Sequence, residues 1–197
     1  MRKNICILTL LFIFVTGCAT YGPVRIDEKT GLYKTSTVLK AGAIQKRDTD
    51  VNLKKFRFVY LVANSNIYHG RFEFFVRSAL ARNGFKYVLN KDELTKMITA
   101  NPKLSSIQSI DDPVSLKRLS DLVGPIMRVD FKSQWDGDVS RYITLAITDL
   151  SNNNMLLKIY HPKFIWGDVD SEAHYPVLNE IKKWIDDSSA GGTRKSI

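Results

Sequence analysis

The sequence predicts one α/β (α+β) domain, a two-layer sandwich in which a mixed sheet of about five strands carries three to four helices. Three observations predict it. A nearly continuous apolar run suits a buried strand, segments with helical apolar spacing lie between and after strands, and a stretch of alternating apolar and polar residues ends in a β-hairpin. The expected order over residues 53–187 is β-α-β-α-α-β-β-β-α.

The first strand and helix are predicted over residues 56–83. Phe56 to Ala63 is apolar on both faces, which is typical of a central buried strand. The helix over 70–83 presents one apolar stripe at helical spacing, made of Phe72, Phe75, Val76, Ala79 and Leu80. Gly84 ends this helix. Phe74 lies off the stripe, and we expect it to be an exposed contact.

The middle of the chain predicts a short strand and two helices. The strand covers residues 85–89, and the first of the helices covers 92–100 and ends before Pro102. Asp112 is suited to cap the second helix with Pro113 as its first residue, and Gly124 stops it.

The last part of the chain predicts three strands and a helix. Met127, Val129 and Phe131 alternate with charged residues, as in a half-exposed strand. Residues 142–160 form a hairpin around the polar turn 149–154, whose loop is slightly longer than the tightest types. The final helix, 176–186, buries Trp184 among its apolar residues.

The start of the chain indicates export. Arg2 and Lys3 precede an apolar run, 5–15, which is about half the length of roughly 20 residues that a membrane-spanning helix needs. The run ends in Val15-Thr16-Gly17-Cys18, which resembles the lipobox of bacterial lipoprotein signals. That resemblance implies cleavage before Cys18 and lipid on its thiol. The alternatives are an ordinary signal with a chance cysteine, or a buried N-terminal helix.

Cleavage there divides the chain into a signal peptide (1–17), a lipidated flexible tether (18–52), the domain (53–187) and a disordered tail (188–197). Cys6 leaves with the signal, so the mature chain has one thiol, which excludes a disulfide and a thiolate zinc site. By the same resemblance, Ala19 after the cysteine implies the outer membrane, facing the periplasm. Acyl chains on the mature terminus make the anchoring lasting.

The net charge of +9 lies mostly outside the expected domain. Residues 19–55 hold eight Lys and Arg against four Asp and Glu, whereas residues 56–187 hold seventeen against sixteen. A nucleic-acid-binding protein carries its basic surface on the folded domain, so this distribution and the export signal exclude that class. The basic tether either contacts anionic headgroups or cell-wall polymer, or is simply solvated.

Three local features resemble known envelope lipoproteins. The helix at 70–83 ends in Gly-Phe and enters a strand, the strand 143–149 leads into a polar turn, and 175–179 opens a helix containing tryptophan. Together they resemble the small α/β domains of the curli-secretion channel lipoprotein, the penicillin-binding-protein activator lipoprotein and the N-terminal domain of the Tol propeller protein. The resemblance covers residues 53–187 and implies a protein partner in the envelope.

The sequence contains no phosphate-binding loop, zinc-protease motif or nucleophile elbow. His69, His161 and His174 stand near element ends, and we expect them at the surface or in loops. The denser carboxylates favour solvated turns over a calcium site or a glycosidase pair. These carboxylates are Asp136, Asp138, Asp168, Asp170 and Glu172. No cofactor or metal is predicted.

Aromatic residues supply the candidate binding surface, Trp135, Trp166 and Tyr175, with Tyr142 and Tyr160 near the same strand ends. The alternative is that they are ordinary core and rim residues. The sequence therefore predicts a non-enzymatic binding, assembly or accessory factor for another envelope component. The alternatives are a cell-wall hydrolase or other periplasmic enzyme, and a self-assembling channel-like lipoprotein.

Overall fold

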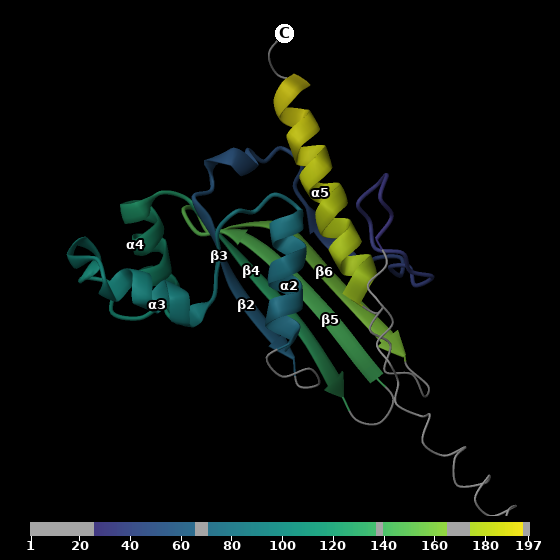
Figure 1. Cartoon of the computed structure of the whole chain (residues 1–197), viewed down its shortest axis with the longest axis horizontal. Coiled ribbons are helices and arrows are strands. Elements are labelled where there is room, and N and C mark those ends of the chain that lie inside the picture. The colour runs from purple at the N-terminus through teal and green to yellow at the C-terminus, as the bar shows by residue number, and fades with distance from the viewer. Residues whose placement is uncertain (1–25, 66–70, 137–139, 165–173, 195–197) are drawn as a thin grey trace, which may run out of the picture.

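The computed structural model describes residues 26–65, 71–136, 140–164 and 174–194 (Figure 1). Its elements are, in order, β1 (Ile44–Arg47), the 3-10 turn η1 (Leu53–Lys55), β2 (Phe58–Ser65), α2 (Arg71–Arg82), β3 (Val88–Leu89), α3 (Lys91–Thr99), the 3-10 turn η2 (Pro102–Leu104), α4 (Pro113–Val123), β4 (Ile126–Asp136), β5 (Ser140–Asp149), β6 (Asn154–Phe164) and α5 (Tyr175–Arg194). From β2 onward this order confirms the predicted one. The sheet has six strands where five were expected, because β1 joins it.

The sheet is mixed, with the strand order β1-β6-β5-β4-β2-β3. β2 runs parallel to both β3 and β4, whereas the pairs β4–β5, β5–β6 and β6–β1 are antiparallel. Helices lie between the strands of the parallel part, whereas short connections join β4 to β5 and β5 to β6, which are antiparallel. β1, from the start of the domain, adds to the free edge of β6. The predicted hairpin is therefore β5–β6.

The two faces of the sheet are covered unequally. α2 and α5 lie on one face, where the larger apolar core forms around Trp184 and Phe131 (Figure 1). On the opposite face α3 and α4 cover only the β2 end, through a smaller core that contains Phe58 and Tyr60. No helix among the described residues is long and apolar enough to cross a bilayer.

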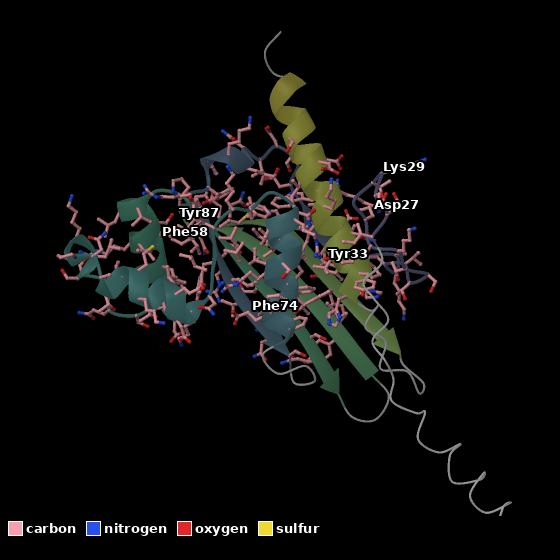
Figure 2. The ribbon with its side chains drawn as sticks, in the orientation of Figure 1. Asp27, Lys29, Tyr33, Phe58, Phe74 and Tyr87 are labelled. Atoms are coloured by element: carbon pink, nitrogen blue, oxygen red, sulfur yellow. The ribbon has the colours of Figure 1, made fainter. Side chains whose placement is uncertain are left out.

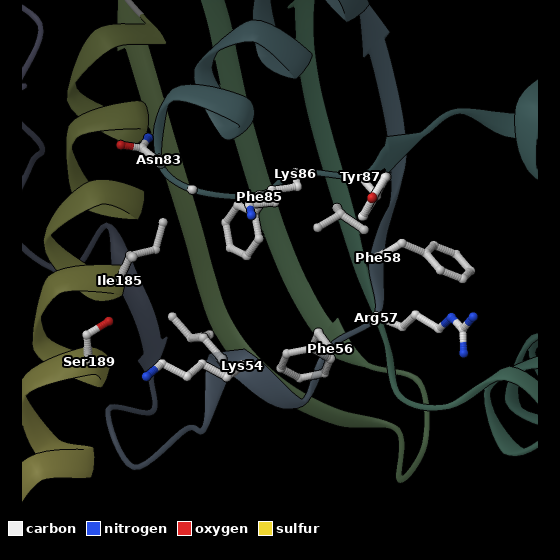
Figure 3. A pocket seen from close by; sticks show the side chains of 13 residues that line it. Lys54, Phe56, Arg57, Phe58, Asn83, Phe85, Lys86, Tyr87, Ile185 and Ser189 are labelled. Carbon is white, nitrogen blue, oxygen red and sulfur yellow. The ribbon is translucent and has the colours of Figure 1, made fainter.

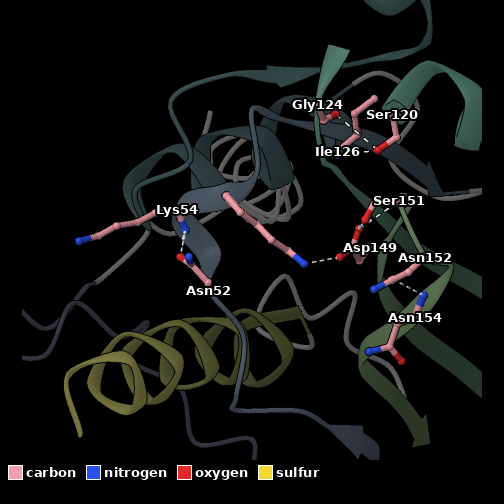
Figure 4. Close-up of polar contacts among 10 residues, drawn as sticks. Asn52, Lys54, Ser120, Gly124, Ile126, Asp149, Ser151, Asn152 and Asn154 are labelled. Carbon is pink, nitrogen blue, oxygen red and sulfur yellow. Dashed lines mark hydrogen bonds and ion pairs between the residues drawn. The ribbon is translucent and has the colours of Figure 1, made fainter. Parts of the chain in front are cut away.

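Side-chain caps set the helix ends that the sequence predicted. Asp112 accepts hydrogen bonds from the backbone of Ser115 and Val114 at the start of α4, and the bonds from Ser115 hold its pKa below the usual range. At the other end of α4, Ser120 accepts from the Ile126 N–H at 3.2 Å and donates to the carbonyl of Gly124 (Figure 4). These bonds fix the turn from α4 into β4.

The N-terminal segment departs from the expected tether. Residues 26–52 are ordered onto the domain: Tyr33, Ala43 and Val51 are buried, and β1 pairs with β6. Asn179 of α5 accepts from the Tyr33 N–H at 2.7 Å and donates to its carbonyl. The tether expectation is therefore wrong for 26–52. β1 is an edge strand with mostly exposed side chains, so it carries no apolar alternation that would reveal it.

The C-terminal tail departs in the same way. α5 continues to Arg194, past the expected end at 186 and through most of the stretch predicted to be disordered. Ser188, within this stretch, is buried against the domain. The Ser-Ser-Ala-Gly-Gly composition weakens a helix locally, but packing of the preceding apolar face overrides that propensity.

A buried ion pair joins η1 to the end of β5. The Asp149 carboxylate is fully buried, contacts the Lys55 ammonium at 2.5 Å and accepts from the Ser151 N–H and hydroxyl (Figure 4). Burial raises the pKa of Asp149, but the bonds from Lys55 and Ser151 outweigh it, so the pKa lies below its ordinary value of 3.8. The charged carboxylate thus stabilises the fold.

We expect Asp149→Asn to lower the free energy of unfolding at pH 7 by about 1–3 kcal/mol, because the charge-assisted bond to Lys55 is lost. Urea unfolding measures this. Because the folded pKa is depressed, the contribution is present above the unfolded pKa and disappears as pH falls through the folded value. The difference between the wild type and the variant should therefore begin to shrink below about pH 4 and disappear only below the folded pKa. Asp121→Asn, in an exposed pair with Lys117, is the control and should cost less than about 1 kcal/mol. A deficit that stays constant down to pH 3 would contradict this assignment.

Candidate functional site: a basic aromatic groove

A groove of about 560 Å³ lies between α5 and the start of β2 (Figure 3). One wall is α5, which contributes Ile185 and Ser189. The other side is formed by η1, by the first residues of β2 and by the loop that joins α2 to β3. We call it the basic aromatic groove, and its lining side chains are those of Leu53, Lys54, Phe56, Arg57, Phe58, Val59, Asn83, Phe85, Lys86, Tyr87, Ile185 and Ser189, with Gly84 in the loop.

Local backbone geometry shapes the loop wall. Gly84 has φ +95°, in the left-handed region, and its N–H donates to Ala81 while the next N–H donates to Leu80. This turn ends α2 and directs Phe85 back toward α5 (Figure 3). The Tyr87 carbonyl then accepts from the Val59 N–H, which fixes the loop to β2. The predicted Gly84 stop is confirmed, and it also positions the groove.

The 3-10 turn η1 forms the floor. Asn52 caps it by accepting from the Lys54 N–H at 3.1 Å (Figure 4). The Lys55 ammonium, held by Asp149, also lies over the Phe56 ring at 4.9 Å from its centre. The ion pair thus holds Lys55 against the Phe56 ring, while the neighbouring Lys54 lines the groove.

The charge in the groove is uncompensated. Lys54, Arg57 and Lys86 line it, and no carboxylate does. Among the residues that the structure describes, none of these three cations is ion-paired, and Arg57 donates only to the carbonyl of Val123. All three are exposed. Three unpaired cations in one lining give the groove a positive potential that would attract an anionic ligand.

Four aromatic side chains line the same groove. Phe56 and Phe85 are half-buried and lie in the middle of the view, whereas Tyr87 is 67% exposed (Figures 2 and 3). Phe58 is buried at the edge toward α4. Exposed or half-exposed aromatic rings beside an arginine are the residue types that dominate binding energy at protein interfaces. The groove therefore combines apolar anchors with unpaired cations.

Of the three residues in the predicted binding surface, Tyr175 is the one whose side chain the structure describes. Tyr175, at the start of α5, is only 5% exposed, and its ring stacks on Tyr33 at 4.8 Å between centres. Its placement on a binding surface is therefore wrong. Trp135 stands in β4 opposite Arg141, but its side chain and all of Trp166 lie outside the described residues. For those two the expectation stays a prediction.

The structure also describes Phe74, His161 and His174, which the sequence had singled out. Phe74 on α2 is 73% exposed, as expected (Figure 2). His161 and His174 are buried, which corrects their expected surface position: strand β6 turns His161 toward the core, and His174 packs among Phe72, Phe75 and Phe131. His69, Asp138, Asp168, Asp170 and Glu172, and the side chain of Asp136, lie outside the described residues. In the described parts of the chain no three metal-ligating side chains come together.

The groove residues were missed by sequence reasoning. Lys54 was counted with the tether, and Lys86 and Tyr87 were counted with a short strand. The available signal was the run Phe85-Lys86-Tyr87 after the helix-ending Gly84, which has two exposed positions in a loop. Its partner, α5, could not be placed beside it without the tertiary fold.

No model of a known protein family matches the chain, and no curated protein matches it. Three similar solved structures are the C-terminal domain of LpoB from Salmonella enterica, the PelC dodecamer from Paraburkholderia phytofirmans and lipoprotein GNA1162 from Neisseria meningitidis. The LpoB domain is 15% identical, with 54% of this chain and 82% of that chain covered and a TM-score of 0.36. PelC is 8% identical, with 71% of this chain and 93% of that chain covered and a TM-score of 0.39. GNA1162 is 11% identical, with 71% of this chain and 98% of that chain covered and a TM-score of 0.37.

We expect Gly84→Ala to lower the free energy of unfolding by about 1–2 kcal/mol, since a side chain at φ +95° is strained. The added Cβ meets no atom within 4 Å, so the cost comes from the backbone alone. Denaturant unfolding measures it. Ala81→Gly, on the exposed face of α2, is the matched control and should cost about 1 kcal/mol through helix propensity without moving the loop. An unchanged stability in Gly84→Ala would show that the turn does not hold this loop.

Proposed function

We propose that this protein is a non-enzymatic accessory lipoprotein of the bacterial envelope that docks an acidic, apolar segment of another envelope protein in the basic aromatic groove. The observation that carries the proposal is the groove itself, whose lining combines three cations without ion-pair partners in the described structure with the half-buried or exposed rings of Phe56, Phe85 and Tyr87, and includes no carboxylate. A protein segment fits this chemistry, because aromatic rings and arginine provide the anchors and the lysines select acidic neighbours.

The electrostatics also favour a transient, salt-dependent encounter. Lys54 and Lys86 are exposed at the rim, where charges mainly steer association and lose their effect as salt screens them. The half-buried rings of Phe56 and Phe85 then supply apolar contact area in the centre. Such a division of roles suits an accessory factor that engages and releases its partner.

The envelope location in this proposal rests on the lipobox. Val15, Thr16 and Gly17 precede Cys18, and lipid on Cys18 anchors the chain to the outer membrane with the domain on the periplasmic side. An anchored binding domain needs no catalytic centre to act. Its role is to hold a partner near the membrane.

Groove docking is tested by site-specific photo-crosslinking in cells that express the full chain. A photoreactive phenylalanine analogue at Tyr87 should give a discrete adduct with an envelope protein, and Lys54→Glu with Lys86→Glu should abolish that adduct by reversing the groove charge. The same analogue at Arg118, on the exposed side of α4, is the control position. No adduct at Tyr87, an equal adduct at Arg118, or an adduct that survives the charge reversal would each overturn the proposal.

Anchoring is tested separately with Cys18→Ser. Metabolic labelling with a fatty acid should mark the wild type and not the variant, and the variant should leave the membrane fraction because it has lost its only lipid-accepting thiol. Cys6→Ser, within the expected signal, is the matched control and should keep both label and membrane association. Label on the Cys18→Ser protein would contradict the assignment.

A further inference from the structure

No described helix covers the sheet face opposite α2 and α5 over the greater part of β4, β5 and β6. Along these strands, fully buried residues such as Val129, Leu145 and Ile159 alternate with residues that are partly or fully exposed. The exposed set, which we call the open face, is Arg128, Asp130, Lys132 and Gln134 on β4, Tyr142, Thr144, Ala146 and Thr148 on β5, and Lys158 and Tyr160 on β6. The open face lies on the side of the sheet opposite to α5, which forms one wall of the basic aromatic groove.

The charges on the open face leave two free cations. Asp130 is neutralised by its own strand neighbour, because Arg128 binds both carboxylate oxygens at 2.8 Å. Lys132 and Lys158 have no ion-pair partner among the described residues. A face of this kind attracts anions without offering a second acidic group that repels them.

The strand register places these lysines around a hollow. Thr144 pairs with Lys132 on one side and with Tyr160 on the other, while Ala146 pairs with Asp130 and Lys158. The small side chain of Ala146 leaves a hollow of about 430 Å³, whose rim includes both lysines and Tyr160. Lys132 and Tyr160 stand two strand spacings apart, roughly 10 Å, which a short oligosaccharide covers.

Two tyrosines complete the face. Tyr142 and Tyr160 lie with ring centres 6.3 Å apart, Tyr160 is 41% exposed, and the Tyr142 hydroxyl donates to the side-chain carbonyl of Gln134. The rings offer flat surfaces with polar tips, and Thr144 and Gln45 add neutral hydrogen-bonding groups at the rim. The hollow thus has cations, tyrosine rings and neutral hydrogen-bonding groups around one small space.

We propose that the open face binds an acidic glycan of the cell wall, with Tyr160 stacking on a sugar ring and Lys132 and Lys158 binding its carboxylates. This goes beyond the proposed docking groove, which takes a protein segment on the other side of the sheet. Only the choice of the cell wall as the source rests on the export proposed above.

The experiment is co-sedimentation of the full-length protein, purified in detergent, with purified peptidoglycan sacculi. Lys132→Ala with Lys158→Ala should weaken binding by about tenfold, since two charge-assisted contacts are lost. Tyr160→Ala should weaken it comparably. Amidation of the sacculus carboxylates should reduce wild-type binding as the lysine variant does. Circular dichroism should show that these substitutions of exposed residues leave the fold intact.

Two control variants distinguish binding at the open face from binding at the groove and from a general loss of positive charge. Lys96→Ala with Lys103→Ala removes the same charge from exposed positions on α3 and η2 and should leave binding unchanged. Lys54→Glu with Lys86→Glu, which tests the groove, should also leave it unchanged. Absence of wild-type binding, an equal loss in both alanine pairs, or full binding to amidated sacculi would overturn the proposal.

Discussion

Trp184 lies fully buried beneath α5, and its indole N–H donates to the carbonyl of Asp48 in the N-terminal segment. This contact ties together three parts of the chain that are far apart in sequence: α5, the sheet it covers, and the segment leading out of β1. Asn179, one helical turn earlier, holds Tyr33 through its backbone. Without α5 the large core would lose its cover, the N-terminal segment its attachment, and the groove one of its walls.

The domain carries two surfaces with different chemistry. The basic aromatic groove has half-buried rings in its centre and cations at its rim, which is the organisation of a protein-binding site. The open face of the sheet has a smaller hollow with a lysine on either side and Tyr160 at its rim. The difference follows from the fold: helices frame the groove and supply apolar side chains, whereas the open face displays the polar half of alternating strands.

Much of this fold was predictable from the sequence because its signals are local. The alternation from Met127 to Phe131, the Asp112-Pro113 cap and Gly84 each depend on neighbouring residues, and each was placed correctly. β1 was not predictable because edge strands need little apolar alternation. Tyr175 was misplaced because an aromatic residue looks the same in a core as on a surface; its burial depends on Tyr33, 142 positions away.

The groove shows the same limit for function. Charge counting divided the chain at residue 55, so Lys54 was separated from Lys86 and their common position was invisible. Only the tertiary fold brings η1, the loop after α2 and α5 to one place. Lys55, next in sequence to Lys54, faces the other way and pairs with buried Asp149, so adjacent lysines have opposite roles.

Because the N-terminal segment from Ile26 onward packs on the domain, only a short stretch of chain connects the domain to Cys18. Since Ile26 already pairs with Tyr33, only residues 19–25 separate the domain from Cys18. Seven residues, even fully extended, span at most about 25 Å. Lipid on Cys18 would therefore keep the domain close to the surface of the bilayer. There the effective concentration of the domain toward a membrane-bound partner would reach about the millimolar range. A low affinity of the groove for its partner would then be sufficient. It would also favour membrane-bound partners, since the same affinity would be negligible for a partner in the open periplasm.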